Sequence, residues 1–284
     1  MSASFYETSP WPSLFRVVFW RVRSEISVSF CVLASGSSGN AALLATGSTR
    51  ILLDAGLSVR ELGRRLELVG EQIERLDAIL ITHEHCDHIA GLPVLARSKK
   101  LRAPIYLSRL TVPMIDWGES QPRLETFQAG ASFEIGDIEV NSFSIPHDAA
   151  DPVGFCFETG SVRIAAVTDL GYIPESVKYH LRRTDLVLLE SNHDLEMLKV
   201  GPYPWSVKQR VMSRVGHLSN LVMAEYLEQE LPERVRHLVL GHLSEHNNHP
   251  EIVREFATRA LEMRGLRAAL TIAEPHAPSE VFQF

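Results

Sequence analysis

The sequence has 284 residues, of which 45% are hydrophobic and 22% are charged, and its formal net charge is −7 at pH 7. This composition is typical of a globular protein with a sizeable core rather than of a disordered chain. Three cysteines, an odd and sparse set, favour reduced thiols in the cytoplasm over a disulfide framework. No apolar run approaches about 18 residues, so we expect no membrane partner. The negative charge indicates no general nucleic-acid surface, although carboxylates that bind metal ions count in this sum.

The first 25 residues differ from the rest of the chain. An apolar stretch at 14–20 is short, is broken by Arg16 and is followed by Arg21 and Arg23. A secretory signal would need a basic start, an uninterrupted apolar run and small residues at a cleavage site. We therefore predict an N-terminal extension of unknown role over 1–25, one domain over 26–284, and a cytoplasmic location. The sequence indicates no protein partner.

From residue 26 onward, short apolar strands dominate the pattern and helices separate them. The predicted strands lie at 27–34, 41–46, 50–54, 76–82, 104–107, 132–135, 138–144, 153–158, 163–168, 185–190, 236–240 and 268–273. The predicted helices lie at 58–70, 89–100, 174–182, 206–215, 219–230 and 250–263. No linker, internal repeat or low-complexity tract divides this pattern, so we expect a single α/β domain with a four-layer or sandwich architecture.

Residues 82–88, T-H-E-H-C-D-H, bring several good metal ligands into one loop. His83, His85, Asp87 and His88 follow an apolar strand, and ligand sites favour the carboxyl edge of a sheet. Imidazole and carboxylate groups suit zinc, manganese and iron. A polar helix-capping loop would account for one or two histidines, but three histidines with an aspartate favour a metal site.

One loop cannot complete a metal centre, so we expect further ligands at the ends of other strands. Three predicted strands are followed by such residues, which are His147, Asp169 and His242. Taken singly, the first fits an ordinary loop residue, the second a helix cap and the third a packed histidine. Together they bring two imidazoles and a carboxylate to the sheet edge where the histidine loop lies.

This series of motifs resembles the metallo-β-lactamase superfamily. The resemblance implies an αββα four-layer sandwich with two divalent metal ions, zinc or manganese, at the sheet edges. The implied ligands of the first ion are His83, His85 and His147. The implied ligands of the second ion are Asp87, His88 and His242, with Asp169 as a bridge between the ions. Asp54 matches an early aspartate that orients the ligand loop from behind, and we expect Cys86 to pack beneath that loop.

Longer strings are similar to one group within the superfamily. They are L-A-S-G-S-S-G-N at 33–40, P-H-D-A-A-D-P-V-G at 146–154, E-S-N-H-D at 190–194, G-P-Y-P-W at 201–205, G-H-L-S-N at 216–220 and G-H-L-S at 241–244. They resemble the YycJ (WalJ) group, which is described as bacterial 5′→3′ DNA exonucleases. The resemblance implies a phosphodiesterase with DNA as its substrate.

Two alternatives stay open at this point. The first is a small-molecule hydrolase of the same fold that acts on a cyclic phosphodiester, a thioester or a lactone, because the fold alone does not fix the substrate. The second is a domain retained for binding without catalysis. That alternative predicts gaps in the ligand set, and the set implied by the resemblance has none.

The residues also suit phosphodiester cleavage in their own right. Two divalent ions roughly 3.5–4 Å apart would clamp a phosphate and activate water near neutral pH, and Asp87 would hold the proton of that water. His217 is our candidate for protonating the leaving oxygen, oriented by Glu190 as in related phosphodiesterases of the superfamily. The simpler alternatives are that His217 only begins a helix and that Glu190 only ends a strand in a salt bridge.

Polar and basic residues beside these strand ends are candidates for contacts to the substrate. The predicted substrate-binding residues are Ser37, Ser38, Asn40, Asn192, His193, Lys208 and Arg210. The first three would form a nest of donors for an anion, or only a hairpin turn. Asn192 and His193 would donate hydrogen bonds to phosphate oxygens, or would only cap the chain locally. The two cations, near Tyr203 and Trp205, would hold a nucleic-acid strand, or form only a solvated helix face.

Overall fold

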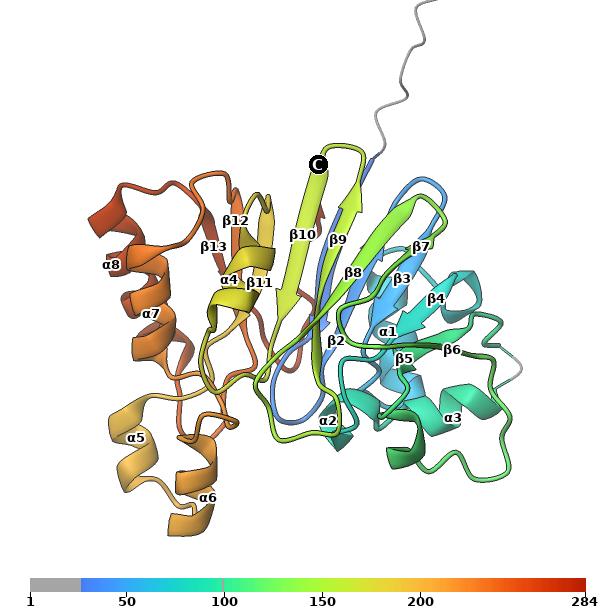
Figure 1. Cartoon of the computed structure of the whole chain (residues 1–284), viewed down its shortest axis with the longest axis horizontal. Helices are drawn as coiled ribbons and strands as arrows, with labels where there is room; N and C mark the ends of the chain where they lie inside the picture. The colour runs from blue at the N-terminus through green and yellow to red at the C-terminus, as the bar shows by residue number, and fades with distance from the viewer. Residues whose placement is uncertain (1–26, 99) are drawn as a thin grey trace, which may run out of the picture.

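The computed structural model describes residues 27–98 and 100–284, so the predicted N-terminal extension lies outside the described residues. Two sheets pack face to face, and helices cover the outer side of each (Figure 1). This arrangement confirms the predicted αββα sandwich. None of the described helices has the length and hydropathy that crossing a membrane requires.

The first sheet is mixed and has seven strands among the described residues. In order across the sheet they are β14 (Phe282–Gln283), β1 (Ser29–Ala34), β2 (Ala41–Ala45), β3 (Arg50–Leu53), β4 (Ala78–Leu80), β5 (Ile105–Ser108) and β6 (Leu124–Phe127). Strands β3 to β6 are parallel to one another. Because parallel strands end at the same edge, the loops that follow β3 and β4 lie side by side.

The second sheet also has seven strands within the described ranges. Their order is β13 (Ala269–Ile272), β12 (His237–Gly241), β11 (Leu186–Glu190), β10 (Val162–Val167), β9 (Val153–Thr159), β8 (Ile138–Ser144) and β7 (Ser132–Ile135). Strands β10 to β13 are parallel, whereas β9 is antiparallel to both β8 and β10. Strands β8, β10, β11 and β12 therefore all end at one edge.

The helices occupy the two outer layers. They are α1 (Val59–Leu68), α2 (Cys86–Ile89), α3 (Leu92–Arg97), α4 (Glu175–Leu181), α5 (Leu195–Val200), α6 (Trp205–Val211), α7 (Asn220–Gln229) and α8 (Pro250–Arg264), with the 3-10 turns η1 (Ile73–Arg75) and η2 (Val112–Met114). Apolar side chains of α1 and α3 pack on the first sheet, and those of α4, α7 and α8 pack on the second. Helices α5 and α6 extend beyond this layer, below α7 in the view of Figure 1.

Alternating apolar side chains on the strands connect these layers. In β10, Ile164 and Ala166 face the opposite sheet, whereas Ala165 and Val167 face the helices. This period of two is what a strand buried on both faces requires. Each large apolar side chain buried in this way contributes about 1.5–3 kcal/mol. The core therefore holds the two sheets in one relative position, so that loops from both meet at a fixed edge.

Most predicted elements are present with shifted ends, but some predictions are wrong. The helix predicted over 89–100 is the shorter helix α3, which starts only at Leu92, because a separate short helix, α2, precedes it and ends at Ile89. The break falls near Gly91, where a Cβ atom would lie only 2.1 Å from the carbonyl oxygen of Leu57. Helix α6 is shorter than the helix predicted over 206–215. The short elements β6, α5 and β14 were not predicted.

Candidate active site at the sheet edges

Six strand ends converge at one edge of the sandwich. On the first sheet, β3 ends before Asp54 and β4 leads into the loop 83–88. On the second sheet, β8, β10 and β12 lead to His147, Asp169 and His242, and β11 ends at a buried glutamate. The parallel arrangement within each sheet brings these loops together, as the sequence predicted.

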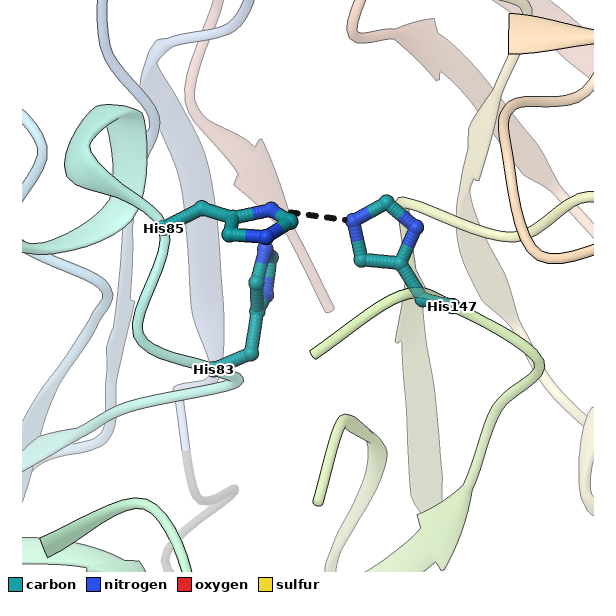
Figure 2. Close-up of side chains that lie close together, drawn as sticks. All are labelled: His83, His85 and His147. Atoms are coloured by element: carbon teal, nitrogen blue, oxygen red, sulfur yellow. Dashed lines mark hydrogen bonds between the residues drawn. The ribbon is translucent and has the colours of Figure 1, made fainter. Parts of the chain in front are cut away.

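Three imidazoles form the first group of potential metal ligands. One nitrogen of each of His83, His85 and His147 lies within 4.8 Å of the others. Figure 2 shows the three rings pointing toward one another, with His85 Nδ1 3.1 Å from His147 Nε2. The other ring nitrogen of His147, Nδ1, lies 3.1 Å from the carbonyl oxygen of Gly216. That contact turns His147 Nε2 toward the group.

The second group combines two carboxylates with two imidazoles, from Asp87, His88, Asp169 and His242. Asp87 Oδ2 lies 3.1 Å from His242 Nε2. Asp169 Oδ2 lies 3.2 Å from His88 Nε2, in an arrangement that forms no hydrogen bond. Asp169 Oδ1 lies 3.9 Å from His147 Nε2 of the first group. Asp169 therefore stands between the two groups, where a bridging ligand would have to stand.

The charges in this centre suit a cation. Burial alone would raise the pKa of Asp169, but the His242 and His88 imidazoles hold it well below its usual value. Burial would likewise raise the pKa of Asp87, and hydrogen bonds with the same two imidazoles lower it well below its usual range. Burial and the neighbouring His88 lower the pKa of His83. Burial would lower the pKa of His88 and His242, but neighbouring carboxylates, Asp169 foremost, raise it well above the usual value in both, so a divalent ion would bind these rings in exchange for protons.

Two buried atoms of the centre have no hydrogen-bond partner among the described residues, His83 Nε2 and Asp169 Oδ2. An unpaired buried polar atom costs about 1–3 kcal/mol, and a coordinated cation would offset that cost. Both atoms belong to the groups whose ligand atoms converge. The donor set of nitrogen and carboxylate oxygen therefore fits divalent metal ions such as zinc or manganese.

Asp54 and Thr82 support the ligand loop from behind. Asp54 Oδ2 lies 2.8 Å from His88 Nδ1, and Asp54 Oδ1 accepts a hydrogen bond from the backbone nitrogen of Thr82 at 2.9 Å. The Thr82 hydroxyl donates to Asp54 Oδ2 at 2.9 Å and lies 3.0 Å from His83 Nδ1. These contacts occupy the Nδ1 atoms of two potential ligand rings and leave their Nε2 atoms facing the centre. The sequence pattern gave Thr82 no role, although it begins the histidine motif.

Three residues of the site have left-handed backbone conformations. The φ angles are 58° at Asp54, 63° at Asp169 and 56° at His242. Each follows its strand by one or two residues. Positive φ is disfavoured for residues other than glycine, and aspartate tolerates it better than most. Backbone strain thus collects at the strand ends that carry potential ligands, as is common at functional sites.

Glu190 and His217 lie beside the second group. Glu190 Oε1 is 2.8 Å from His217 Nδ1, and His217 Nδ1 is 3.7 Å from Asp169 Oδ1. Burial alone would lower the pKa of His217, but the Glu190 carboxylate raises it above its usual value. Burial would raise the pKa of Glu190, but His217 and His242 lower it to about 2. With 18% of its side chain exposed, His217 is accessible from outside the centre.

The three residues predicted to form an anion nest do not lie together, because two are at the surface and one is in the site. Ser37 and Ser38 are exposed in the turn between β1 and β2, whereas Asn40 is buried. The Asn40 amide nitrogen lies 3.2 Å from Asp87 Oδ2 and 3.1 Å from His88 Nε2. Asn40 therefore contacts two potential metal ligands, which the sequence did not predict.

Most of the other predicted substrate contacts have partners within the chain. The Asn192 amide donates to the His242 carbonyl oxygen at 2.8 Å. The Lys208 ammonium donates to the Lys199 carbonyl oxygen at 2.7 Å, and only 8% of the residue is exposed. Arg210 pairs with the Asp148 carboxylate, with one N–O distance of 3.1 Å. The substrate roles of these residues stay predictions.

His193 differs from these residues because its Nδ1 is buried without a hydrogen-bond partner in the described part of the chain. Burial is the main cause that lowers the pKa of His193 to about 4. The ring is therefore neutral at physiological pH, with one nitrogen able to donate and the other able to accept.

The expectation for Cys86 is wrong, because its side chain is exposed. It is the first residue of α2, and the adjacent Asp87 and His88 are the residues that turn toward the centre. Cys31 and Cys156 are buried, and all three thiols are free.

Comparison with known proteins places this architecture in a family. Residues 49–243 match the family described as the Beta-lactamase superfamily domain. The chain belongs to this superfamily. It is 37% identical to the exodeoxyribonuclease YycJ of Bacillus anthracis over 248 residues, which cover 84% of this chain and 91% of that protein. It is 38% identical to the exodeoxyribonuclease WalJ of Streptococcus pneumoniae over 234 residues, which cover 81% of this chain and 86% of that one.

A solved structure shows the same fold. The metallo-β-lactamase fold protein YhfI from Bacillus subtilis superposes with a TM-score of 0.71 at 19% identity, covering 92% of this chain and 100% of that one. The resemblance to the superfamily and to its YycJ (WalJ) group is thus confirmed. With the two groups of potential ligands, and a third that joins Glu190 and His217 to Asp169 and His242, the family assignment makes the chain a metal-dependent hydrolase.

Proposed function

We propose that the chain is a phosphodiesterase that holds two divalent ions, zinc or manganese, and degrades DNA from the 5′ end. The observation that carries this proposal is the contact between Glu190 and His217, 2.8 Å long, beside the second ligand group. The 3′-oxygen of a nucleotide is a poor leaving group and benefits from a proton donor, whereas a thiolate leaves without one. The names of the relatives, both exodeoxyribonucleases, support DNA as the substrate.

The seven potential ligands have separate roles in this proposal. The residues that would hold the first ion are His83, His85 and His147. The residues that would hold the second are Asp87, His88 and His242, with Asp169 shared between the ions. When bound, the ions supply charge stabilisation for a phosphate and lower the pKa of water. Asp54 keeps the ligand ring of His88 oriented through its contact with Nδ1.

The remaining steps belong to side chains of this chain. Asp87 is an ionised carboxylate, so it would accept a hydrogen bond from the attacking water and orient it. The Nδ1 atom of His217 contacts Glu190, so its Nε2 would face the substrate and protonate the leaving oxygen. General acid catalysis of this kind contributes about 10²–10⁴-fold. Glu190 favours the charged ring that this step needs.

Other parts of the proposal depend on the sequence alone. The substrate contacts of Ser37, Ser38, Asn40, Asn192, His193 and the α6 cations stay predictions. The polarity of digestion, a cytoplasmic location and the domain boundary after residue 25 also stay predictions. Of these contacts, His193 has the most favourable surroundings, because its buried Nδ1 has no partner among residues 27–98 and 100–284.

A time course on labelled nucleic acids tests the proposal. The purified chain is incubated with Mn²⁺ and 5′-labelled or 3′-labelled DNA, single-stranded and duplex, beside matched RNA. Parallel reactions contain a cyclic dinucleotide, a thioester, a lactone and bis(p-nitrophenyl) phosphate. Release of mononucleotides from DNA 5′ ends alone is the expected result. Turnover of the thioester, the lactone or the cyclic substrate with intact polynucleotides would contradict the proposal and favour a small-molecule hydrolase.

A further inference from the structure

Glu190 is a buried carboxylate with four contacts. It ends β11, between β10 and β12 in the second sheet, and it has no exposed surface. Its Oε1 lies 2.8 Å from His217 Nδ1 and 2.9 Å from His242 Nδ1. Its Oε2 accepts hydrogen bonds from the backbone nitrogens of Leu170 at 2.9 Å and Leu218 at 3.1 Å. Each of the two carboxylate oxygens therefore contacts two nitrogen atoms.

We propose that Glu190 is a positioning residue for the metal ligand His242 as well as for His217, so that occupancy of the second cation position depends on it. The part that concerns His217 rests on the proposed function, and the part that concerns His242 requires only that the second ligand group binds a cation. Glu190 thereby connects the metal centre to the proton donor through a single side chain.

The contacts of Glu190 determine which ring nitrogens carry protons. Its Oε2 accepts hydrogen bonds from two backbone N–H groups, and its Oε1 lies within hydrogen-bond distance of two imidazole Nδ1 atoms. A carboxylate oxygen accepts hydrogen bonds, so both facing Nδ1 atoms carry a proton. In a neutral imidazole the other nitrogen, Nε2, is then free to bind a cation. His242 Nε2 lies 3.1 Å from Asp87 Oδ2, within the second ligand group.

The second oxygen of Glu190, Oε2, holds the backbone next to Asp169 and His217. Leu170 follows Asp169, the residue between the two ligand groups, and Leu218 follows His217. On the other side of His217, the Gly216 carbonyl oxygen contacts the first group through His147 Nδ1. Loss of Glu190 therefore disturbs the support of the second group directly and shifts the segment that carries His217.

Glutamine cannot replace Glu190, although it has nearly the same shape. If its oxygen faces the imidazoles, its NH₂ group faces two backbone N–H donors that have no alternative form. If the amide is reversed, the NH₂ group faces the imidazoles, whose Nδ1 atoms must then become acceptors. That change moves the ring proton to Nε2, the atom that a cation needs. The first orientation therefore sets buried donors against each other, and the second puts a proton on the atom that a cation needs.

Metal analysis of Glu190→Gln tests the inference on the full chain. We expect zinc content to fall from two ions to about one per chain, with affinity for the second ion lowered about 10- to 100-fold. His217→Ala is the matched control, because Glu190 keeps three of its four donors, and we expect both ions to remain bound. Wild-type zinc affinity in Glu190→Gln would overturn the inference. Equal zinc loss in His217→Ala would also overturn it, because the effect would then act through His217.

A measurement on the unchanged protein covers the case in which Glu190→Gln does not fold. Imidazole ¹⁵N NMR of the zinc-loaded chain should show a proton on Nδ1 of both His217 and His242, and no proton on Nε2 of His242, with signals assigned through His217→Ala and His242→Ala. A ring of either residue without a proton on Nδ1, or a protonated Nε2 in His242, would overturn the inference. A wild-type chain that binds two ions but leaves DNA intact would refute the proposed nuclease function alone, so the two failures can be distinguished.

Discussion

The ligand edge and helix α6 both contain polar side chains that suit a nucleic-acid enzyme, but their surroundings differ. At the ligand edge, buried atoms such as His83 Nε2 and Asp169 Oδ2 have no partner in the described part of the chain. On α6, the cations of Lys208 and Arg210 are bound to a carbonyl oxygen and a carboxylate of the same chain. Trp205, at the start of α6, is 63% exposed.

The two regions therefore differ in how strongly their polar side chains indicate a ligand. Buried polar atoms that converge without partners are costly, so they indicate a site that can bind a ligand. Cations that already have partners within the chain stabilise the fold and indicate a ligand only weakly. We therefore expect substitutions at the ligand edge to have much larger effects than those on α6, and the following experiments test that expectation.

The largest effect is expected at the ligands themselves. His85→Ala or Asp169→Ala should lower turnover by roughly 10³-fold or more, because stabilisation of several kcal/mol is lost with the metal. Metal content, measured by inductively coupled plasma mass spectrometry, should fall in parallel. His276→Ala, at an exposed histidine far from the site in sequence, serves as control. Full activity with reduced metal content would contradict the proposal that turnover requires the metal that these residues hold.

The next effect concerns the proton donor. His217→Ala should lower turnover of DNA by about 10²-fold or more, because the leaving oxygen loses its proton source. A substrate with a good leaving group, bis(p-nitrophenyl) phosphate, should be affected much less. Steady-state rates on both substrates measure the difference. An equal reduction on both would mean that His217 has a different role.

A smaller effect is expected behind the ligands. Asp54→Ala removes the partner of His88 Nδ1, and we expect metal affinity to fall about 10- to 100-fold. Competition with a zinc chelator measures this affinity. Asp137→Ala is a matched control, because its carboxylate accepts hydrogen bonds from Thr46 and Thr49 before β3, at the opposite end of that strand. Unchanged affinity in Asp54→Ala would show that the ring needs no such support.

The smallest effect is expected on α6. Replacing Lys208 and Arg210 together by alanine should weaken DNA binding modestly and reduce its salt dependence by about 0.9 in log–log slope for each phosphate that the protein no longer neutralises. Fluorescence anisotropy at several salt concentrations measures both quantities. Lys100→Ala, which removes an exposed pair with Glu74, is the control. If the double variant binds like the control, α6 is not part of the DNA path.

Most of the fold, and the meeting of the potential ligands at one edge, could be predicted from the sequence for a physical reason. Buried strands have short apolar runs, and the potential ligands follow those runs directly, as Asp169 and His242 do. Parallel strands then bring the ligands to one edge without any knowledge of side-chain packing. The strand β14 was not predicted, because it has only two residues and forms only through its pairing with β1.

The contacts of individual polar side chains could not be predicted in this way. Asn40 contacts Asp87, which is 47 positions away in the sequence. Lys208 donates a hydrogen bond to the Lys199 carbonyl oxygen because α5 and α6 lie next to each other. The orientation of Cys86 depends on which of its neighbours face the centre. Such contacts are set by tertiary structure, so composition and spacing do not contain them.

The central claim is that residues from both sheets hold two divalent ions. Its most direct test is elemental analysis of chain that has been stripped with a chelator, loaded with zinc or manganese and passed through a desalting column. We predict two ions per chain that remain through desalting. No more than a trace of either metal would contradict the claim and remove the basis of the proposed chemistry.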